Sequence, residues 1–179
     1  MTLPSPTAPK AIAIAIAKAN PNQRNWRDHG LPDLRKAEYP AEKAPALVSG
    51  AMSHEHAVES LRATLGVTFG GAMSVQTPLG TVTIQDSTLG HVVEKRQDQR
   101  ERYAGFIVPT LERPSEVWAV RYDDGSTRDR YIKVFSRAKY DILVMVKVME
   151  DGGVFWNMMN RDRAGMNALR IGDLRWKCQ

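Results

Sequence analysis

The hydrophobic pattern of this chain changes its period at Ser115, and that change limits the possible folds more than any other feature. From there apolar and polar residues alternate in short runs, separated by turn signals such as Asp123-Asp124-Gly125 and Asp151-Gly152-Gly153. Alternation of period two, interrupted by Asp-Gly turns, is typical of β-strands joined by hairpins. We therefore predict strands over 116–122, 130–135, 140–149 and 154–158, paired in chain order as an antiparallel meander.

Helical signals dominate the sequence before Ser115. Ser53 is a suitable N-cap for a helix over 54–65, which Gly66 would end. A second helical stretch runs over 89–111, with a polar run at 94–102 that favours a bend or break, and Pro109 should kink or end it. Two short strands are predicted over 72–77 and 80–84.

These elements predict an α+β fold in which the N-terminal helices pack on one face of a four-stranded antiparallel β-meander. After Asn160 the pattern predicts a short polar helix or loop ending at Arg170, and 173–177 can form a last edge strand. The other face of the sheet is expected to stay open and to carry the functional residues.

The first 50 residues have a different composition, because they hold seven of the ten prolines. We predict that residues 1–50 form an irregular arm or linker and that residues 51–179 form the folded domain. Residues 1–10 favour a flexible lead-in. The alternating Ile and Ala of 11–17 suit a strand, and their alanine content suits a short helix equally well. Trp26 is expected to pack on the domain rather than to contact a partner.

Composition excludes several classes of protein. The single cysteine, Cys178, rules out an intramolecular disulfide and a zinc site built from cysteines. No apolar run reaches the roughly 20 residues that cross a bilayer, so we expect a soluble domain without a membrane span. Glycine-rich phosphate loops, the GxSxG motif and metal-ligand spacing are all missing from the sequence, and no cofactor or metal is expected. The net charge is +5, of which residues 90–179 carry +4, and a basic surface attracts polyanions such as nucleic acid.

Strand alternation sorts the side chains of the predicted sheet onto two faces. Ile132 and Val134 should face the helices, which puts Tyr131 and Lys133 on the open face. Lys147 interrupts an otherwise apolar strand. Arg121 and Asn157 lie on the neighbouring strands, so one surface could collect tyrosine, lysine, arginine and amide groups. An ordinary solvated face is the alternative interpretation.

One chemistry needs only residues of these types. RNA can be cleaved without a metal, because its 2′-hydroxyl attacks the adjacent phosphate when a protein supplies an acid or base and cations. His91 is the one histidine in the second half of the chain, and we expect it near the start of a helix, where free N–H groups favour phosphate. The alternative is that His91 caps or packs that helix.

The order of motifs also resembles a known family. The relevant segments are 81–84, Gly90-His91-Val92-Val93, Pro114-Ser115-Glu116-Val117-Trp118, 130–133, 155–157 and Leu169-Arg170-Ile171-Gly172. Over about residues 75–177 they resemble the phage-encoded barnase/EndoU/colicin/RelE-like nuclease domains, found at the C-terminus of phage Mu-type minor head proteins and of polymorphic toxins.

This resemblance implies a metal-independent endoribonuclease of toxin type. It implies His91 as general acid or base, Lys133 and Arg170 as stabilisers of phosphate charge, and Tyr131 and Asn157 as positioning groups. Substrate contacts would come from Arg100, Arg121 and Arg163. The substrate would be RNA, with tRNA one option, and an immunity protein is a possible partner.

The site of action implied by the resemblance is the bacterial cytoplasm, reached through a phage particle or as a secreted toxin. Two alternatives stay open at this point. One is a non-catalytic, phage head-associated nucleic-acid-binding domain, and the other is a transferase on the same scaffold.

Overall fold

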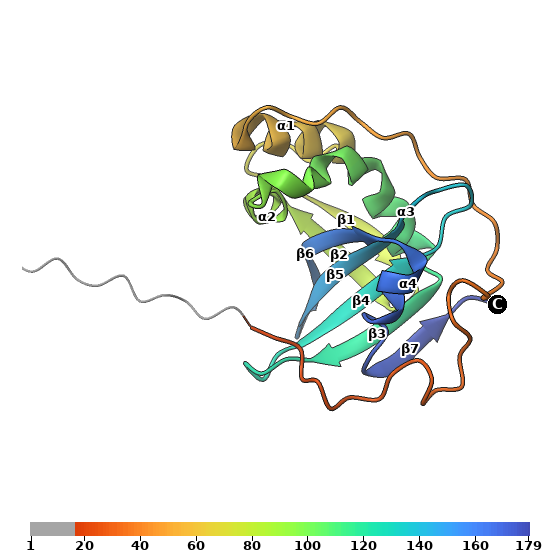
Figure 1. Ribbon diagram of the computed structural model, residues 1–179. Coiled ribbons are helices and arrows are strands. Elements are labelled where there is room, and N and C mark those ends of the chain that lie inside the picture. The colour runs from red at the N-terminus through yellow and green to blue at the C-terminus, as the bar shows by residue number, and fades with distance from the viewer. Residues whose placement is uncertain (1–16) are drawn as a thin grey trace, which may run out of the picture.

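The computed structural model describes residues 17–179, and Figure 1 shows an α+β fold built on one sheet. The predicted lead-in over 1–10, and all of the segment 11–17 except Ala17, lie outside the described residues. The sheet has seven strands in the order β1-β2-β6-β5-β4-β3-β7. Their bounds are β1 Ala72–Thr77, β2 Gly80–Gln85, β3 Glu116–Arg121, β4 Thr127–Lys133, β5 Asp141–Met149, β6 Gly152–Arg161 and β7 Asp173–Lys177.

The predicted sheet of four strands is therefore too small. Strands β3 to β6 are antiparallel neighbours, but the β1–β2 hairpin and β7 join the same sheet. The hairpin joins through a short parallel pairing, in which Val82 and Thr83 lie opposite Gly153 and Val154. β7 pairs antiparallel with β3. Both pairings link segments far apart in sequence, so local periodicity could not predict them.

The helices are short. They are α1 His54–Leu65, α2 Asp86–Val92, the 3-10 helices η1 Arg96–Asp98 and η2 Arg100–Phe106, α3 Ile107–Glu112 and α4 Arg163–Asn167. The polar run that predicts a break coincides with η1 and with Gln99, whose φ of 44° is left-handed. Pro109 does not end its helix, because it lies in the first turn of α3, where its missing N–H costs no hydrogen bond.

Helix α1 has the caps that its sequence predicts. The side chain of Ser53 accepts a hydrogen bond from the backbone N–H of His56, and Gly66 adopts a left-handed φ of 75°. Ala57, Leu61 and Leu65 then share one buried face. The cap satisfies an N–H that the helix itself cannot bond.

We expect the substitution Ser53→Ala to lower the free energy of unfolding by about 1 kcal/mol, because it removes this hydrogen bond. Ser53→Asp, which retains an acceptor, serves as the matched control and should stay close to the wild type. Urea unfolding followed by circular dichroism measures both. Equal stability of the alanine variant and the wild type would show that the cap contributes nothing.

The sheet is buried on both faces. The helix-side core contains Val117, Tyr131, Ile142 and Phe155, packed against α1, α2 and α3. The second core contains Trp118, Ile132, Val134, Leu143 and Met145. The predicted orientation of β4 is therefore wrong: Tyr131 faces the helices, and Ile132 and Val134 face away from them. Because both faces are apolar, aliphatic content could not decide between them.

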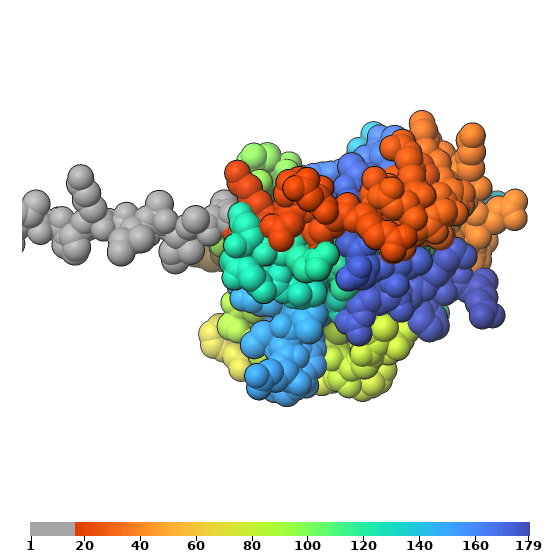
Figure 2. All heavy atoms as spheres, turned by 90° about the horizontal axis from the view of Figure 1, so that it is seen from below, coloured from red at the N-terminus to blue at the C-terminus, as the bar shows by residue number. Residues whose placement is uncertain are grey.

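Residues 17–50 cover much of the second face. They form no helix and no strand beyond single bridges, such as Ala19 with Tyr122 and Asn25 with Ile171. Leu34 is fully buried, and Trp26 packs against the second core. Figure 2 shows this arm, in red and orange, lying along the β3–β4 hairpin and β7. The expected open face is thus closed wherever the arm lies. The division into an arm and a domain stays a prediction.

Candidate active site

The side chain of His91 lies beside Trp156, which also contacts Lys147, at the end of the sheet near α2. The imidazole is 38% exposed, and its ring centroid lies 5.1 Å from that of Trp156. The ammonium of Lys147 lies 4.5 Å from the centroid of the same indole. One indole therefore contacts both an imidazole and an ammonium. His91 lies in the last turn of α2, so the expected phosphate site at a helix N-terminus is wrong for this residue.

A β-bulge in β6 brings Trp156 to this position. Asn157 lies opposite Met145 and Phe155 lies opposite Val146, which leaves Trp156 as the extra residue. Bulges redirect side chains in this way and are common beside active sites. On its other side β6 pairs with β2 only at Gly153 and Val154. Beyond that point α2 and η2 pack against β6 instead of a strand.

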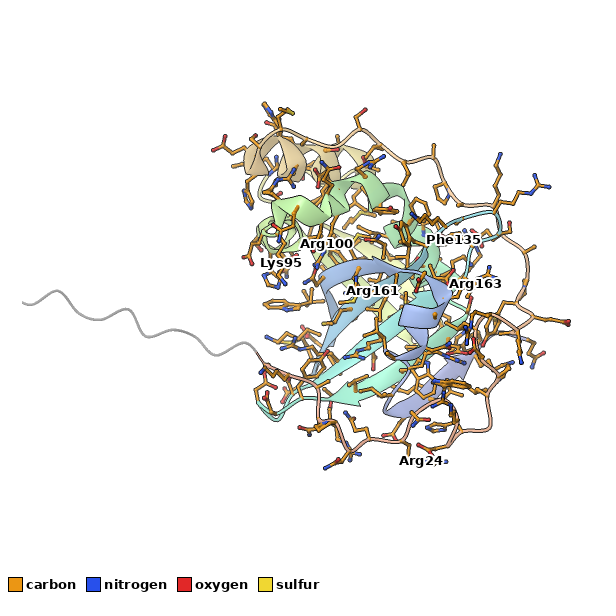
Figure 3. All side chains as sticks on the ribbon, in the orientation of Figure 1. Arg24, Lys95, Arg100, Phe135, Arg161 and Arg163 are labelled. Carbon is orange, nitrogen blue, oxygen red and sulfur yellow. The ribbon has the colours of Figure 1, made fainter. Side chains whose placement is uncertain are left out.

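Asn157 links β6 to an arginine of η2. The Nη1 group of Arg100 donates to Oδ1 of Asn157 over 2.8 Å, and its Nη2 group donates to Asp98 over 3.0 Å. The Arg100 side chain is 11% exposed, so its guanidinium is held rather than free in solvent. Figure 3 shows Arg100 and Lys95 near each other, at the same side of the molecule as α2.

A third cation lies on β4, the strand next to that of Lys147. Arg128 of β4 is its direct partner in the β4–β5 ladder. The guanidinium of Arg128 lies 4.2 Å from the ring centroid of Tyr122 and 3.6 Å from the carboxylate of Asp124. We call the set of His91, Arg100, Arg128, Lys147, Trp156 and Asn157 the His91 cluster. Cations and an imidazole at one end of a sheet can together hold a phosphate and move a proton.

Glu94 completes the surroundings of the imidazole. Its carboxylate lies 3.2 Å from Nδ1 of His91, one turn later in the chain. A carboxylate next to Nδ1 favours the tautomer with a proton on Nδ1, which leaves Nε2 as the unprotonated nitrogen. In that tautomer Nε2 can act as a base.

Five of the eight site residues predicted from the sequence do not belong to this cluster, and Tyr131 and Lys133 are two of them. The hydroxyl of Tyr131 is buried in the helix-side core 3.0 Å from that of Thr77, and burial raises the pKa of Tyr131. The ammonium of Lys133 is 2.7 Å from Glu42 and 2.5 Å from the carbonyl of Arg113. Their partners assign both side chains a structural role, apart from the His91 cluster.

Arg170 is fully buried and forms a two-pronged ion pair. Its Nε and Nη2 groups donate to the two carboxylate oxygens of Glu116 over 2.8 and 2.6 Å. Its Nη1 group donates to the carbonyl of Pro32 and to Asn167, each over 2.9 Å. All of these bonds lie in the second core, beneath the arm. Arg170 therefore fixes the arm to the sheet, and no part of its guanidinium is open to a substrate.

The two other predicted substrate contacts lie elsewhere on the surface. Arg121 is exposed at the end of β3, where its backbone N–H donates to Gln23. Arg163, labelled in Figure 3, begins α4. Its Nε lies 3.7 Å from the buried carboxylate of Asp141. Neither shows a contact with the His91 cluster.

Asp141 makes stability depend on pH. Burial raises its pKa to about 6, and Arg163 opposes that shift only in part. The folded protein therefore keeps this proton from about pH 4 to about pH 6, where the unfolded chain, with a pKa near 3.8, loses it. Stability contributed by this group is lost as the pH rises through that window.

We expect Asp141→Asn, which is neutral at every pH, to flatten this dependence and to stabilise the protein at pH 7 by at most about 3 kcal/mol. Urea unfolding between pH 4 and pH 7 tests it, with the exposed Glu150→Gln as control. Destabilisation of the Asp141 variant at pH 7 would show that the ion pair with Arg163 outweighs the cost of burial.

Sequence reasoning missed two members of the cluster. Trp156 and Arg128 gave no signal, because a bulge and a cross-strand pairing place them. Lys147 did give one, as a charge inside an apolar strand. Within residues 17–179, no three His, Cys, Asp or Glu side chains lie close enough together to hold a metal ion. No helix of the described part of the chain is both long and apolar enough to cross a membrane.

Comparison with known proteins gives one match. The family model described as phage-Barnase-EndoU-ColicinE5/D-RelE like nuclease2 matches residues 60–177. No curated protein and no solved structure matches the chain. The matched region begins within α1 and includes all seven strands and every residue of the His91 cluster.

Proposed function

The chain belongs to the phage-Barnase-EndoU-ColicinE5/D-RelE like nuclease2 family, and from that premise we propose that it is an endoribonuclease that cleaves RNA without a metal ion. Family membership makes it a nuclease domain with a nucleic-acid substrate. The choice of RNA rests on one observation: an imidazole and an ammonium meet on one indole, with the Arg100–Asn157 pair beside them. These groups suffice for the internal attack that only a 2′-hydroxyl allows.

In the proposed reaction, Nε2 of His91 accepts the proton of the 2′-hydroxyl. The 2′-oxygen forms a bond to phosphorus as the bond from phosphorus to the 5′-oxygen breaks, and the leaving oxygen takes a proton from water while His91 returns its own proton to the hydroxide that remains. The products are a 2′,3′-cyclic phosphate and a free 5′-hydroxyl. Lys147 and Arg100 stabilise the negative charge that develops on the phosphate oxygens. Glu94 keeps the imidazole in the tautomer that accepts at Nε2.

Cleavage of matched RNA and DNA oligonucleotides in the presence of EDTA tests this proposal. We expect the RNA to be cut and to carry 2′,3′-cyclic phosphate ends, and the DNA of the same sequence to stay intact because it has no 2′-hydroxyl. Mass spectrometry of the products identifies the ends. Loss of all cleavage in EDTA, or equal cleavage of DNA, would contradict the mechanism.

We expect Lys147→Gln to slow RNA cleavage by roughly ten- to a hundredfold, because it removes one cation from the developing charge. Lys139→Gln is the matched control, since this lysine is exposed in the loop that joins β4 to β5, outside the His91 cluster. Rates at saturating RNA are compared, and circular dichroism confirms that both variants are folded. Equal rates for the two variants would remove Lys147 from the mechanism.

The three cations of the cluster also suit a second candidate function, a non-catalytic nucleic-acid-binding domain of phage heads. Such a domain would bind DNA and RNA alike, with an affinity that falls steeply as salt rises, and would cleave neither. Induction in a bacterial host separates the two functions. A ribonuclease toxin acting in the cytoplasm, on tRNA or another RNA, should stop growth at low expression unless an immunity protein is co-expressed. A binding domain should not.

A further inference from the structure

The β1 edge of the sheet has no neighbouring strand. β1 is the first strand in the sheet order and pairs only with β2. Within residues 17–179, no backbone hydrogen bond joins residues 72–77 to any segment other than β2. Because every second residue of an edge strand directs its N–H and C=O away from the sheet, β1 presents a row of backbone groups to which another strand can add.

The opposite edge of the sheet is protected against such pairing. β7 contains Asp173, Arg175 and Lys177, and its register with β3 shifts so that Arg175 is an extra residue. Charged side chains and bulges on an edge strand discourage it from pairing with another chain. β1 has neither: its six pairs with β2 are in unbroken register, and it contains no charged residue and no proline.

The lack of charge extends beyond β1. Residues 66–85 contain no Asp, Glu, Lys or Arg, although these residues make up 25% of the chain. Burial within the fold does not explain this gap, because Ala72, Ser74 and Gln76 are exposed on one face of the strand. The centres of protein interfaces are depleted of charge in the same way. This edge therefore suits a protein strand and not a polyanion, which needs cations.

We infer that β1 docks on β1 of a second copy of this chain, in antiparallel pairing about a two-fold axis near Ser74 and Val75. A six-residue strand that pairs with itself is centred on those residues. The net charge of +5 makes two copies repel each other over most of their surfaces. The charge-free segment 66–85 is where two copies can meet without placing like charges opposite each other. The two seven-stranded sheets then form one continuous sheet.

An exposed aromatic ring supports this arrangement. Phe69 lies three residues before β1, and it is 86% exposed. Antiparallel pairing brings the start of one β1 next to the end of the other, so Phe69 of each copy approaches the Pro78–Leu79 turn of the other copy. Association therefore removes from water a large apolar side chain that the single chain leaves exposed. The inference concerns assembly alone and does not depend on the proposed cleavage.

Sedimentation of the full chain over a wide range of concentration tests the inference. We expect a reversible dimer of twice the monomer mass of 20.0 kDa. Hydrogen exchange of the same samples locates the interface. Amides of residues 72–77 should exchange more slowly as the dimer forms, and amides of β7, the other edge strand, should not change.

Charge variants of β1 decide whether this edge forms the dimer. Ser74→Lys combined with Gln76→Lys places two like charges of each copy near the two-fold axis, and should raise the dissociation constant about tenfold or more. Ser74→Glu combined with Gln76→Glu should do the same. An equimolar mixture of the two double variants should associate again, because lysine then faces glutamate across the axis. Ser87→Lys combined with Gln97→Lys, which makes the same changes at exposed positions outside the sheet, is the matched control.

The substitution Phe69→Ser should also weaken association about tenfold or more, because pairing no longer buries the ring. It should leave the fold unchanged, since the ring is exposed in the single chain. Circular dichroism checks the fold of every variant. A chain that stays monomeric at every concentration would leave the edge for a strand of a different protein and would overturn the inference. A dimer that both β1 double variants retain, or a mixture of the two that stays monomeric, would overturn it as well.

Discussion

Replacing His91 with alanine should slow RNA cleavage by about 10²- to 10⁴-fold, the usual contribution of a general acid or base. The imidazole is the one side chain of the His91 cluster of a type that commonly serves as general acid or base. The cations would still bind the substrate, so the loss should fall on kcat and much less on KM. Single-turnover rates with a labelled RNA oligonucleotide measure the effect.

The matched control for this variant is His56→Ala. His56 is exposed on α1, and its side chain makes no hydrogen bond within the described residues. We expect this variant to cleave like the wild type. An additional Glu94→Gln variant tests the orientation of the imidazole: it should lower the rate less than His91→Ala and should shift the pH profile. A wild-type cleavage rate in the His91→Ala variant would show that His91 is not the acid or base of the reaction, and that the cluster only binds the nucleic acid.

Several elements of this fold could be predicted from sequence because they have local signals, whereas the predicted helical stretch over 89–111 is divided among α2, η1, η2 and α3. Ser53 and Gly66 mark the ends of α1, and the Asp-Gly turns mark the ends of β3, β5 and β6. The size of the sheet has no such signal, because β2 meets β6 at two residue pairs and β7 meets β3 across a long stretch of chain. A short pairing between distant segments leaves almost no trace in the hydrophobic pattern of the sequence, so the pattern cannot predict it.

The faces of the sheet were mispredicted for a related reason. A segment without helix or strand, residues 17–50, supplies the cover of the second face, and its irregular sequence gives no periodicity that would predict packing. Because both faces are buried, the alternation of side chains along a strand does not show which face the helices cover. Tyr131 and Lys133 therefore looked accessible in sequence, whereas the fold buries both.

The candidate site could be predicted only in part. His91, Asn157 and Arg100 are among the residues chosen from sequence, and the fold brings these three side chains to one end of the sheet. Residue type alone could not distinguish these three residues from Arg170. An arginine that pairs with a buried carboxylate and an arginine that binds phosphate look alike in the sequence. The partner of Arg170, Glu116, lies 54 residues earlier in the chain. Nothing local connects the two.

The substitution Arg170→Met should therefore reduce stability rather than catalysis. It leaves the fully buried carboxylate of Glu116 without its guanidinium, at a cost of about 3–5 kcal/mol. That cost is a large share of the roughly 5–15 kcal/mol that holds a typical domain folded. The arm should also loosen, because the same guanidinium binds the carbonyl of Pro32. Urea unfolding measures the first effect, and hydrogen exchange of residues 26–36 measures the second.

A double variant tests whether the loss comes from the orphaned charge. Adding Glu116→Gln to Arg170→Met removes the uncompensated carboxylate but keeps an oxygen that can accept from Trp118, which now donates to Glu116 over 2.8 Å. The double variant should be more stable than Arg170→Met alone, so the two changes should not be additive. Below its unfolding midpoint, Arg170→Met should cleave RNA as the wild type does for each folded molecule. A variant with wild-type stability and no cleavage would instead return Arg170 to the catalytic role that the sequence resemblance implies, and would require the arm to leave the sheet when RNA binds.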